Sequence, residues 1–155
     1  MRAHAVALLL ALLAAPGAAR AEVKVGLPAP RLRVPAPAGK LVAEVRARAR
    51  GGEALWVDGR LLWPEAEAGG EPRVASDLVW SRKADGVAFL SVERGGQTRL
   101  VVVLVAGEGT PAALSWDVPR SALPVHKVMW LGEARVGAGP AELEPHLVAS
   151  WKTAR

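Results

Sequence analysis

The six residues Leu100 to Val105 constrain the fold more than any other stretch of the chain. They are all apolar, and four of them are valine, a β-branched residue that favours strands. Successive residues of a strand point to opposite faces of a sheet, so this strand is apolar on both faces. Such a strand must be covered on both sides. Arg99, immediately before it, is expected to limit aggregation of this segment.

A second stretch predicts a strand with only one buried face. Residues 40–50 alternate strictly, so that one side carries Leu41, Ala43, Val45, Ala47 and Ala49 and the other carries Val42, Glu44, Arg46, Arg48 and Arg50. Further on, Asp58-Gly59 separates the apolar segments 54–57 and 60–63. An Asp-Gly pair between two such segments predicts a hairpin closed by a type I′ turn.

The rest of the chain also reads as short strands separated by glycine- and proline-rich turns. A loop is predicted over 65–76, and a single helical turn over 140–144 before Pro145. We expect further strands over 77–82, 87–93, 98–105, 112–118, 125–131, 134–138 and 147–152. The fold class predicted from this pattern is all-β, with antiparallel hairpins or a meander forming an open sheet or a sandwich.

Residues 1–21 have the pattern of a secretory signal peptide. A short basic start precedes an apolar run over 5–15, and the small residues Ala19 and Ala21 suit a cleavage site. The run has 11 residues, whereas a helix that crosses a bilayer needs about 20. We expect cleavage after Ala21, export to the periplasm or beyond, and no stable membrane insertion of the remaining 134 residues.

The expected organisation after the signal is a proline-rich leader over 22–39 and a single β domain over 40–155. Prolines at positions 28, 30, 35 and 37 favour extended, polyproline-like backbone, which suits a leader or an edge segment. Two interpretations of the leader stay open. It is either a stiff arm along the domain or a docking site of the PxxP type.

Composition narrows the classes of partner. The chain has no cysteine, which excludes a disulfide framework and a lipid-modified cysteine. Its formal charge of +5 falls to +3 when Arg2 and Arg20 are removed with the signal. No basic tract exceeds two residues, so a nucleic-acid partner is not expected. The excess of Ala, Gly, Arg and Pro indicates a bacterial genome rich in G and C.

One unit recurs along the chain: a tryptophan at the end of a strand, a tight turn and an apolar returning strand. It occurs at Trp56, Trp80 and Trp130. The segment WSRKADGVAF, residues 80–89, resembles the blade motif of TolB-type β-propellers, although its Asp85-Gly86 stands two positions late. The resemblance covers residues 77–105 and implies blade-like units. The chain is too short to close a propeller of four or more blades.

The sequence offers no catalytic or metal motif. His126 and His146, with Asp117, Glu142 or Glu144, are a set suited to zinc, but they have no metal-site spacing and equally fit surface positions. No serine stands in a nucleophile motif. We therefore expect a protein that is not an enzyme and uses no cofactor.

Two sets of side chains are candidates for binding. Trp63 and Trp116 have more polar neighbours than the other tryptophans, so they are either core residues or exposed rings that stack on a sugar. Arg46, Arg48 and Arg50 recur at about 7 Å along one strand face. They are either a solvated face or a contact for an acidic partner.

Three functions follow from these features, in order of preference. The first is an exported, non-catalytic β domain that takes part in protein–protein interaction in the bacterial cell envelope. The alternative is a glycan-binding module that uses exposed tryptophan. The third is a metal-dependent hydrolase at His126 and His146.

Overall fold

The computed structural model describes residues 26–37, 39–65, 70–105, 113–120, 123–125, 127–140, 145 and 147–150. These residues form three antiparallel sheets, which we call the first, middle and third sheets. The all-β class is confirmed, and the sheets are open, with none closed into a barrel or a propeller. In this described part of the chain, no helix has the length and apolar character needed to cross a membrane.

Each sheet is a meander of strands that are consecutive or nearly consecutive in sequence. The first sheet contains β1 (Leu32–Pro35), β2 (Val42–Ala47), β3 (Glu53–Val57) and β4 (Arg60–Trp63), in that order. The middle sheet runs β5 (Arg73–Val74), β7 (Gly86–Val92), β8 (Thr98–Leu104) and β9 (Ala113–Asp117), with β6 (Val79–Trp80) also paired to β7. The third sheet contains β10 (Lys127–Trp130), β11 (Arg135–Gly139) and β12 (Leu147–Ser150).

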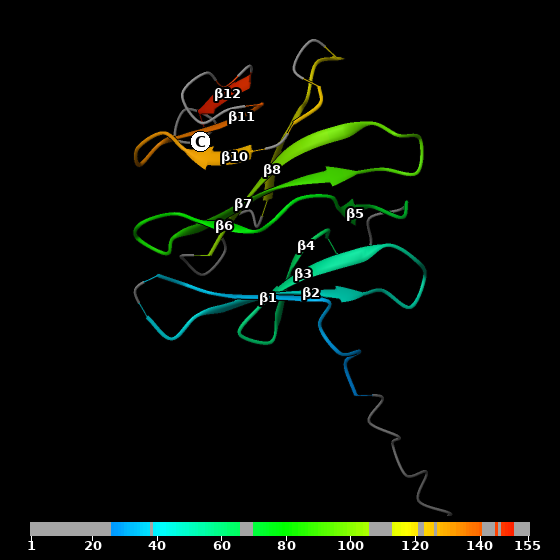
Figure 1. Cartoon of the computed structure of the whole chain (residues 1–155). Helices are drawn as coiled ribbons and strands as arrows, with labels where there is room; N and C mark the ends of the chain where they lie inside the picture. Colours follow the sequence, from blue (N-terminus) through cyan, green and yellow to red (C-terminus); the bar gives the residue numbers. More distant parts are fainter. Residues whose placement is uncertain are drawn as a thin grey trace, which may run out of the picture.

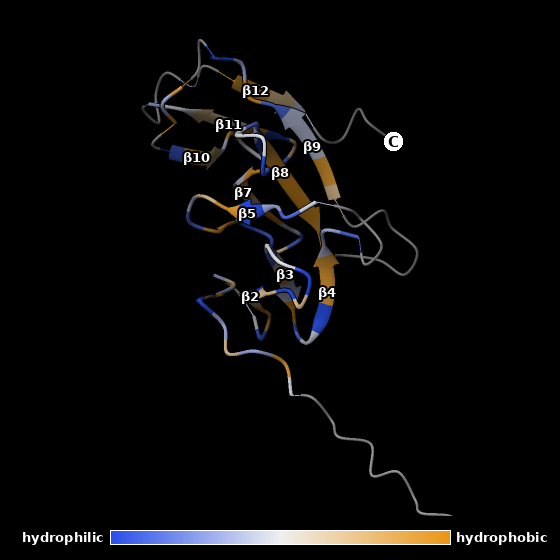
Figure 2. Cartoon of the chain, turned by 90° about the vertical axis from the view of Figure 1, so that its right-hand side faces the viewer, coloured by the Kyte–Doolittle hydropathy of each residue, from blue (hydrophilic) through white to orange (hydrophobic). Residues whose placement is uncertain are grey.

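The three sheets stack as layers, with the middle sheet covered on both faces (Figure 1). Val87, Phe89, Val101 and Val103 point toward the first sheet and form one core with its inner residues. Their neighbours in β7 and β8 point the other way, into a second core shared with the third sheet. Strand β8 is therefore buried on both faces and is coloured as largely hydrophobic in Figure 2. This confirms the prediction drawn from residues 100–105.

Two of the recurring tryptophans connect neighbouring sheets. The Trp80 indole N–H donates to the carbonyl oxygen of Val34 in β1, at 3.0 Å. The Trp130 indole N–H donates to the carbonyl oxygen of Val79 in β6, at 2.9 Å. In both cases the ring reaches from one sheet to a strand of the preceding sheet. The repeat seen in the sequence therefore corresponds to a repeated contact between layers.

The proline-rich leader contributes a strand to the first sheet. Leu32–Pro35 pairs with β2 as the edge strand β1, so residue 40 does not separate the leader from the sheet. Strand β2 follows the predicted alternation at Ala43 and Val45, which are fully buried. It ends at Ala47, however, and residues 48–52 form a turn instead of continuing the strand to 50.

The Asp58-Gly59 hairpin forms as predicted. Both residues have positive φ, 47° and 76°, as a type I′ turn requires. A carboxylate oxygen of Asp58 also accepts a hydrogen bond from the Val42 amide at 3.1 Å, which ties the turn to β2. Below the turn, a β-bulge between Leu55 and Trp56 shifts the register, so that Leu55 pairs with Trp63.

Candidate functional site

Trp63 is a core residue, which is the first of the two alternatives that the sequence left open and excludes its use as an exposed sugar-binding ring. Its side chain is only 8% exposed and meets the ring of Phe89 edge-on, with centroids 4.9 Å apart and planes at 76°. The physical cause is the bulge in the hairpin. Without it, Leu55 would pair with Leu62 and Trp63 would point outward; with it, Trp63 shares the inner face with Leu55.

Trp116 is half-buried and packs against the other core. It pairs with Leu100 across β8 and β9, so it lies on the face of the middle sheet that meets the third sheet. Trp63 contributes to the core on the opposite face. The structure therefore does not bring Trp63 and Trp116 into a common groove.

The three arginines predicted as one row are separated by the end of β2. Arg46 lies in the strand, whereas Arg48 and Arg50 lie in the turn that follows, half-buried and exposed respectively. The guanidinium of Arg46 donates to Glu44 Oε2 from Nε at 3.1 Å and from Nη2 at 2.6 Å, and also to the carbonyl oxygen of Pro28. Arg46 is consequently a fixed side chain, not a mobile solvated one.

The outer face of the first sheet forms the first candidate surface. Trp56 pairs with Glu44 on one side and Leu61 on the other, and neither Trp56 nor Leu61 belongs to either core. Arg33 completes this row on β1 and contacts Glu44 Oε1 at 3.3 Å. We call the surface made by Arg33, Glu44, Arg46, Trp56 and Leu61 the Trp56 face.

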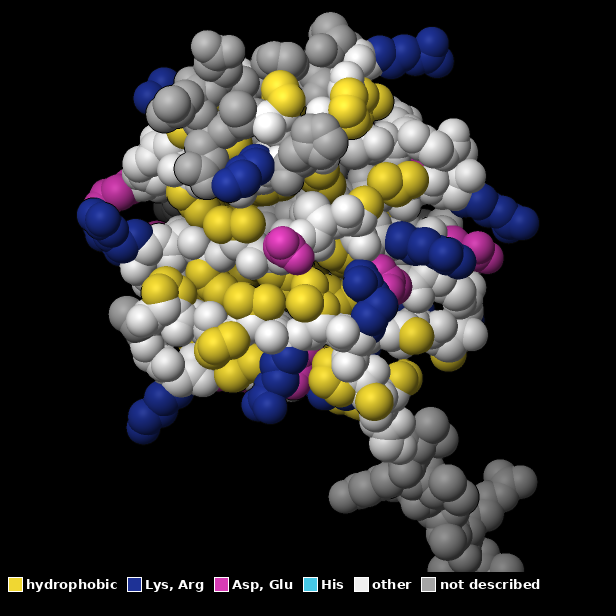
Figure 3. Space-filling view, in the orientation of Figure 1, with side chains coloured by type: hydrophobic (Ala, Val, Ile, Leu, Met, Phe, Trp, Pro, Cys, Tyr) yellow, Lys and Arg dark blue, Asp and Glu magenta, His cyan; other side chains and the backbone are white. Residues whose placement is uncertain are grey.

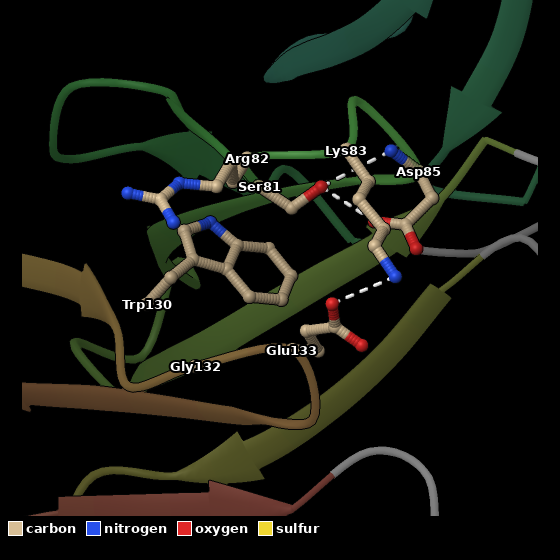
Figure 4. A pocket seen from close by; sticks show the side chains of 7 residues that line it. All are labelled: Ser81, Arg82, Lys83, Asp85, Trp130, Gly132 and Glu133. Atoms are coloured by element: carbon tan, nitrogen blue, oxygen red, sulfur yellow. Dashed lines mark hydrogen bonds and ion pairs between the residues drawn. The ribbon is translucent and has the colours of Figure 1, made fainter.

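The second candidate site is a pocket between two turns, which we call the turn pocket. One wall is the turn from β6 to β7, with Ser81, Arg82, Lys83 and Asp85, and the other is the turn from β10 to β11, with Gly132 and Glu133. Trp130 forms part of its lining (Figure 4). The volume is about 350 Å³, near the lower end of the range for small-molecule sites.

A buried serine holds the first wall of the turn pocket. Ser81 is 5% exposed, and its Oγ accepts hydrogen bonds from the amides of Asp85 and Gly86, both at 3.1 Å. The same hydroxyl donates to Asp85 Oδ1 at 2.5 Å. Ala84 takes a φ of +56° inside this turn. The turn is therefore fixed from within by one side chain.

We expect Ser81→Ala to lower the free energy of unfolding by about 1–3 kcal/mol, because two backbone amides lose their acceptor. Chemical denaturation monitored by circular dichroism measures this change. The exposed residue Ser115 provides the control, and Ser115→Ala should change stability by less than about 0.5 kcal/mol. Equal effects of the two substitutions would contradict the role given to Ser81.

A salt bridge spans the mouth of the turn pocket. Lys83 Nζ lies 2.7 Å from Glu133 Oε1, so that the two turns are joined across about 50 residues of sequence. The hydrogen bond to Glu133, followed by its charge, raises the pKa of Lys83 above its usual 10.5. Lys83 therefore carries its full charge in the bridge at neutral pH and loses it only as the pH rises through the higher, folded-state value.

A cleft also opens at the opposite end of β7, between the first and middle sheets. Its floor includes Trp63, Ser91 and Val101, which are almost fully buried. Its rim carries ion pairs, among them Arg99 with Glu93 and with Asp117, each at 3.1 Å. The pairs are exposed and contribute little stability. The tryptophan of this cleft is almost fully buried, whereas Trp130 of the turn pocket is half-buried, so the turn pocket offers more aromatic surface to a ligand.

The proposed metal ligands fall mostly outside the described residues. His126, His146, Glu142 and Glu144 are among the residues whose structure is not described, as are residues 141–144 of the predicted helical turn. The described residues contain no group of three or more potential metal-binding side chains. The metal-site hypothesis therefore stays a prediction.

Sequence reasoning missed the turn pocket and Trp56 as binding features. The sequence did contain a pattern that pointed to them, because Trp56, Trp80 and Trp130 all stand in the same repeated unit of strand, tight turn and returning strand. What the sequence did not show is that two of these units, in different sheets, place their turns beside each other.

Comparison with known proteins returned no match, whether with protein-family models, with curated proteins or with solved structures. The function must therefore be argued from the chain itself.

Proposed function

We propose that this protein is an exported, non-catalytic β domain that binds another protein in the bacterial cell envelope through its Trp56 face. Export and the bacterial source rest on the signal-like residues 1–21 and on composition. The observation that carries the proposal is an aromatic ring on the outer face of the first sheet, between Leu61 and a glutamate that binds both Arg33 and Arg46.

The composition of the Trp56 face is that of a protein interface. Tryptophan and arginine are the residues most enriched among side chains that dominate binding energy. Trp56 is half-buried on a face that no other layer of the described structure covers, and Leu61 extends its apolar area. The bonds of Arg46 to Glu44 and Pro28 hold its guanidinium in place beside this area. Little side-chain freedom would be lost on binding, which favours affinity.

The charge around this face points to an acidic partner. The Arg33–Glu44–Arg46 group carries one net positive charge. The side chain of Arg31, just before β1, reaches toward the middle sheet instead. Arg31 is anchored by Glu53, at 2.5 Å and 3.0 Å, and by the Val74 carbonyl, at 3.0 Å. The hydrogen bond from Arg31 to Glu53 raises the pKa of Arg31, so its charge is constant at physiological pH. Figure 3 shows charged side chains with hydrophobic ones between them along the margin of the first sheet.

The proposal is tested by capture from an envelope extract of the source organism with the immobilised protein. Trp56→Ala should reduce the captured partner by about tenfold or more, as expected for a residue that dominates an interface. Raising the salt from about 50 to 500 mM should slow association, because it screens the arginines.

Trp130→Phe is the matched control, since it alters a tryptophan in the turn pocket and keeps the Trp56 face intact. Thermal melts of both variants establish that each is folded. Capture that is equal for wild type and Trp56→Ala would overturn the proposal.

A further inference from the structure

The turn pocket has chemistry that the Trp56 face does not share. It combines an aromatic ring, a hydroxyl, two carboxylates and two cationic side chains within about 350 Å³. It lies between the middle and third sheets, whereas the Trp56 face is the outer surface of the first sheet. The two sites are therefore separate, and what binds at one need not bind at the other.

The indole of Trp130 is held in a fixed orientation. Its N–H donates to the Val79 carbonyl, and the far edge of its ring lies over Gly86, where a Cβ atom would stand only 3.0 Å from the indole Cη2. Gly86 thus lets the ring approach the middle sheet closely. Figure 4 shows the indole among the side chains of Arg82, Lys83 and Glu133. A half-buried ring fixed in this way is a rigid apolar platform.

The charges around this platform balance. Arg82 and Lys83 carry two positive charges, and Asp85 and Glu133 carry two negative ones. An anionic ligand would have to displace Glu133 from Lys83 and would meet the Asp85 carboxylate. A cationic ligand would meet Arg82 and Lys83. The pocket therefore has no net attraction for either charge.

A neutral ligand with many hydroxyl groups fits this arrangement. Carboxylates accept hydrogen bonds from hydroxyls, while ammonium and guanidinium groups donate to them. The apolar C–H face of a sugar ring can lie on an aromatic side chain, and the volume suits one ring. We infer that the turn pocket binds a pyranose unit of a neutral glycan, with Trp130 as the platform and Arg82, Lys83, Asp85 and Glu133 as hydrogen-bonding partners.

The test is a titration of the purified protein with neutral methyl glycosides of glucose, galactose, mannose and N-acetylglucosamine, followed by ¹H–¹⁵N NMR. At least one glycoside should shift the Trp130 indole N–H and the Gly132 amide, with a Kd of about 1–10 mM. Glucuronate and glucose phosphate are the anionic probes, and they should bind no more tightly than the neutral glycosides.

Arg82→Ala and Glu133→Gln alter exposed side chains and should leave the fold intact. Each should weaken glycoside binding at least about threefold, the effect of losing part of one hydrogen bond. Trp56→Ala should leave glycoside binding unchanged. Failure of protein capture and failure of sugar binding are therefore distinguishable.

Two results would overturn the inference. One is the absence of any shift at Trp130 or Gly132 with every neutral glycoside at about 50 mM, well above a weak site's Kd. The other is at least tenfold tighter binding of an anionic probe, which would identify an anion site instead.

Discussion

Replacing Phe89 with alanine should lower the free energy of unfolding by about 3–5 kcal/mol, one of the two largest effects we expect from a single substitution. Phe89 is fully buried in β7 and lies between the first and middle sheets. Truncation leaves a cavity and removes the edge-on contact with Trp63. Against a total stability of about 5–15 kcal/mol, this loss is large.

Equilibrium unfolding in urea, followed by tryptophan fluorescence, measures the effect, and Tm should fall by roughly 10–20 °C. Phe89→Leu is the matched control, because it keeps most of the volume and should cost less than about 1.5 kcal/mol. If Phe89→Ala cost under about 1 kcal/mol, the first sheet would not cover this face of the middle sheet.

Leu100→Ala should lower the free energy of unfolding by about 2–5 kcal/mol, because Leu100 packs on the opposite face of the middle sheet from Phe89. Leu100 is fully buried in β8 and belongs to the core shared with the third sheet. Its neighbour Val101 faces the first sheet, so consecutive positions of one strand are both intolerant of truncation. If one face of the middle sheet were exposed to solvent, truncation at one of these two positions would cost little stability.

The same urea titration serves for Leu100→Ala, and the control is the preceding residue. Arg99 is partly exposed and forms ion pairs with Glu93 and Asp117 at the surface. Arg99→Ala should therefore change stability by no more than about 1 kcal/mol. Similar small effects for both substitutions would contradict the burial of β8 on two faces.

The middle sheet was predictable because its signal is local. A strand with apolar residues on both faces must have both faces buried, whichever segments of the chain pack against them. The hairpin at Asp58 was predictable for the same reason, since the preference of Asp-Gly for positive φ does not depend on tertiary context. Neither signal states which segments supply the cover, so the order of the layers could not be predicted from sequence.

Trp63 shows why the candidate sites were harder to predict. Its polar neighbours in sequence left core and exposed positions both open, and one extra residue in the β3–β4 pairing turns it inward. A register shift of one residue reverses every side chain beyond it. The turn pocket depends on two turns about 50 residues apart meeting across a salt bridge, and no local pattern encodes that meeting. The predicted arginine row was wrong beyond Arg46, because the turn at 48–52 interrupts the alternation.

The most direct test of the proposed function is site-specific photocrosslinking in living cells of the source organism. A photoreactive amino acid at position 33 lies on the Trp56 face, and one at position 94 lies outside that face, on the rim of the cleft between the first and middle sheets. Both native arginine side chains are well exposed, 66% and 82%, and both pair with a glutamate, so the sites are matched. We predict a discrete adduct with one envelope protein from position 33 and none from position 94. No adduct from position 33, or the same adduct from both positions, would contradict the proposal.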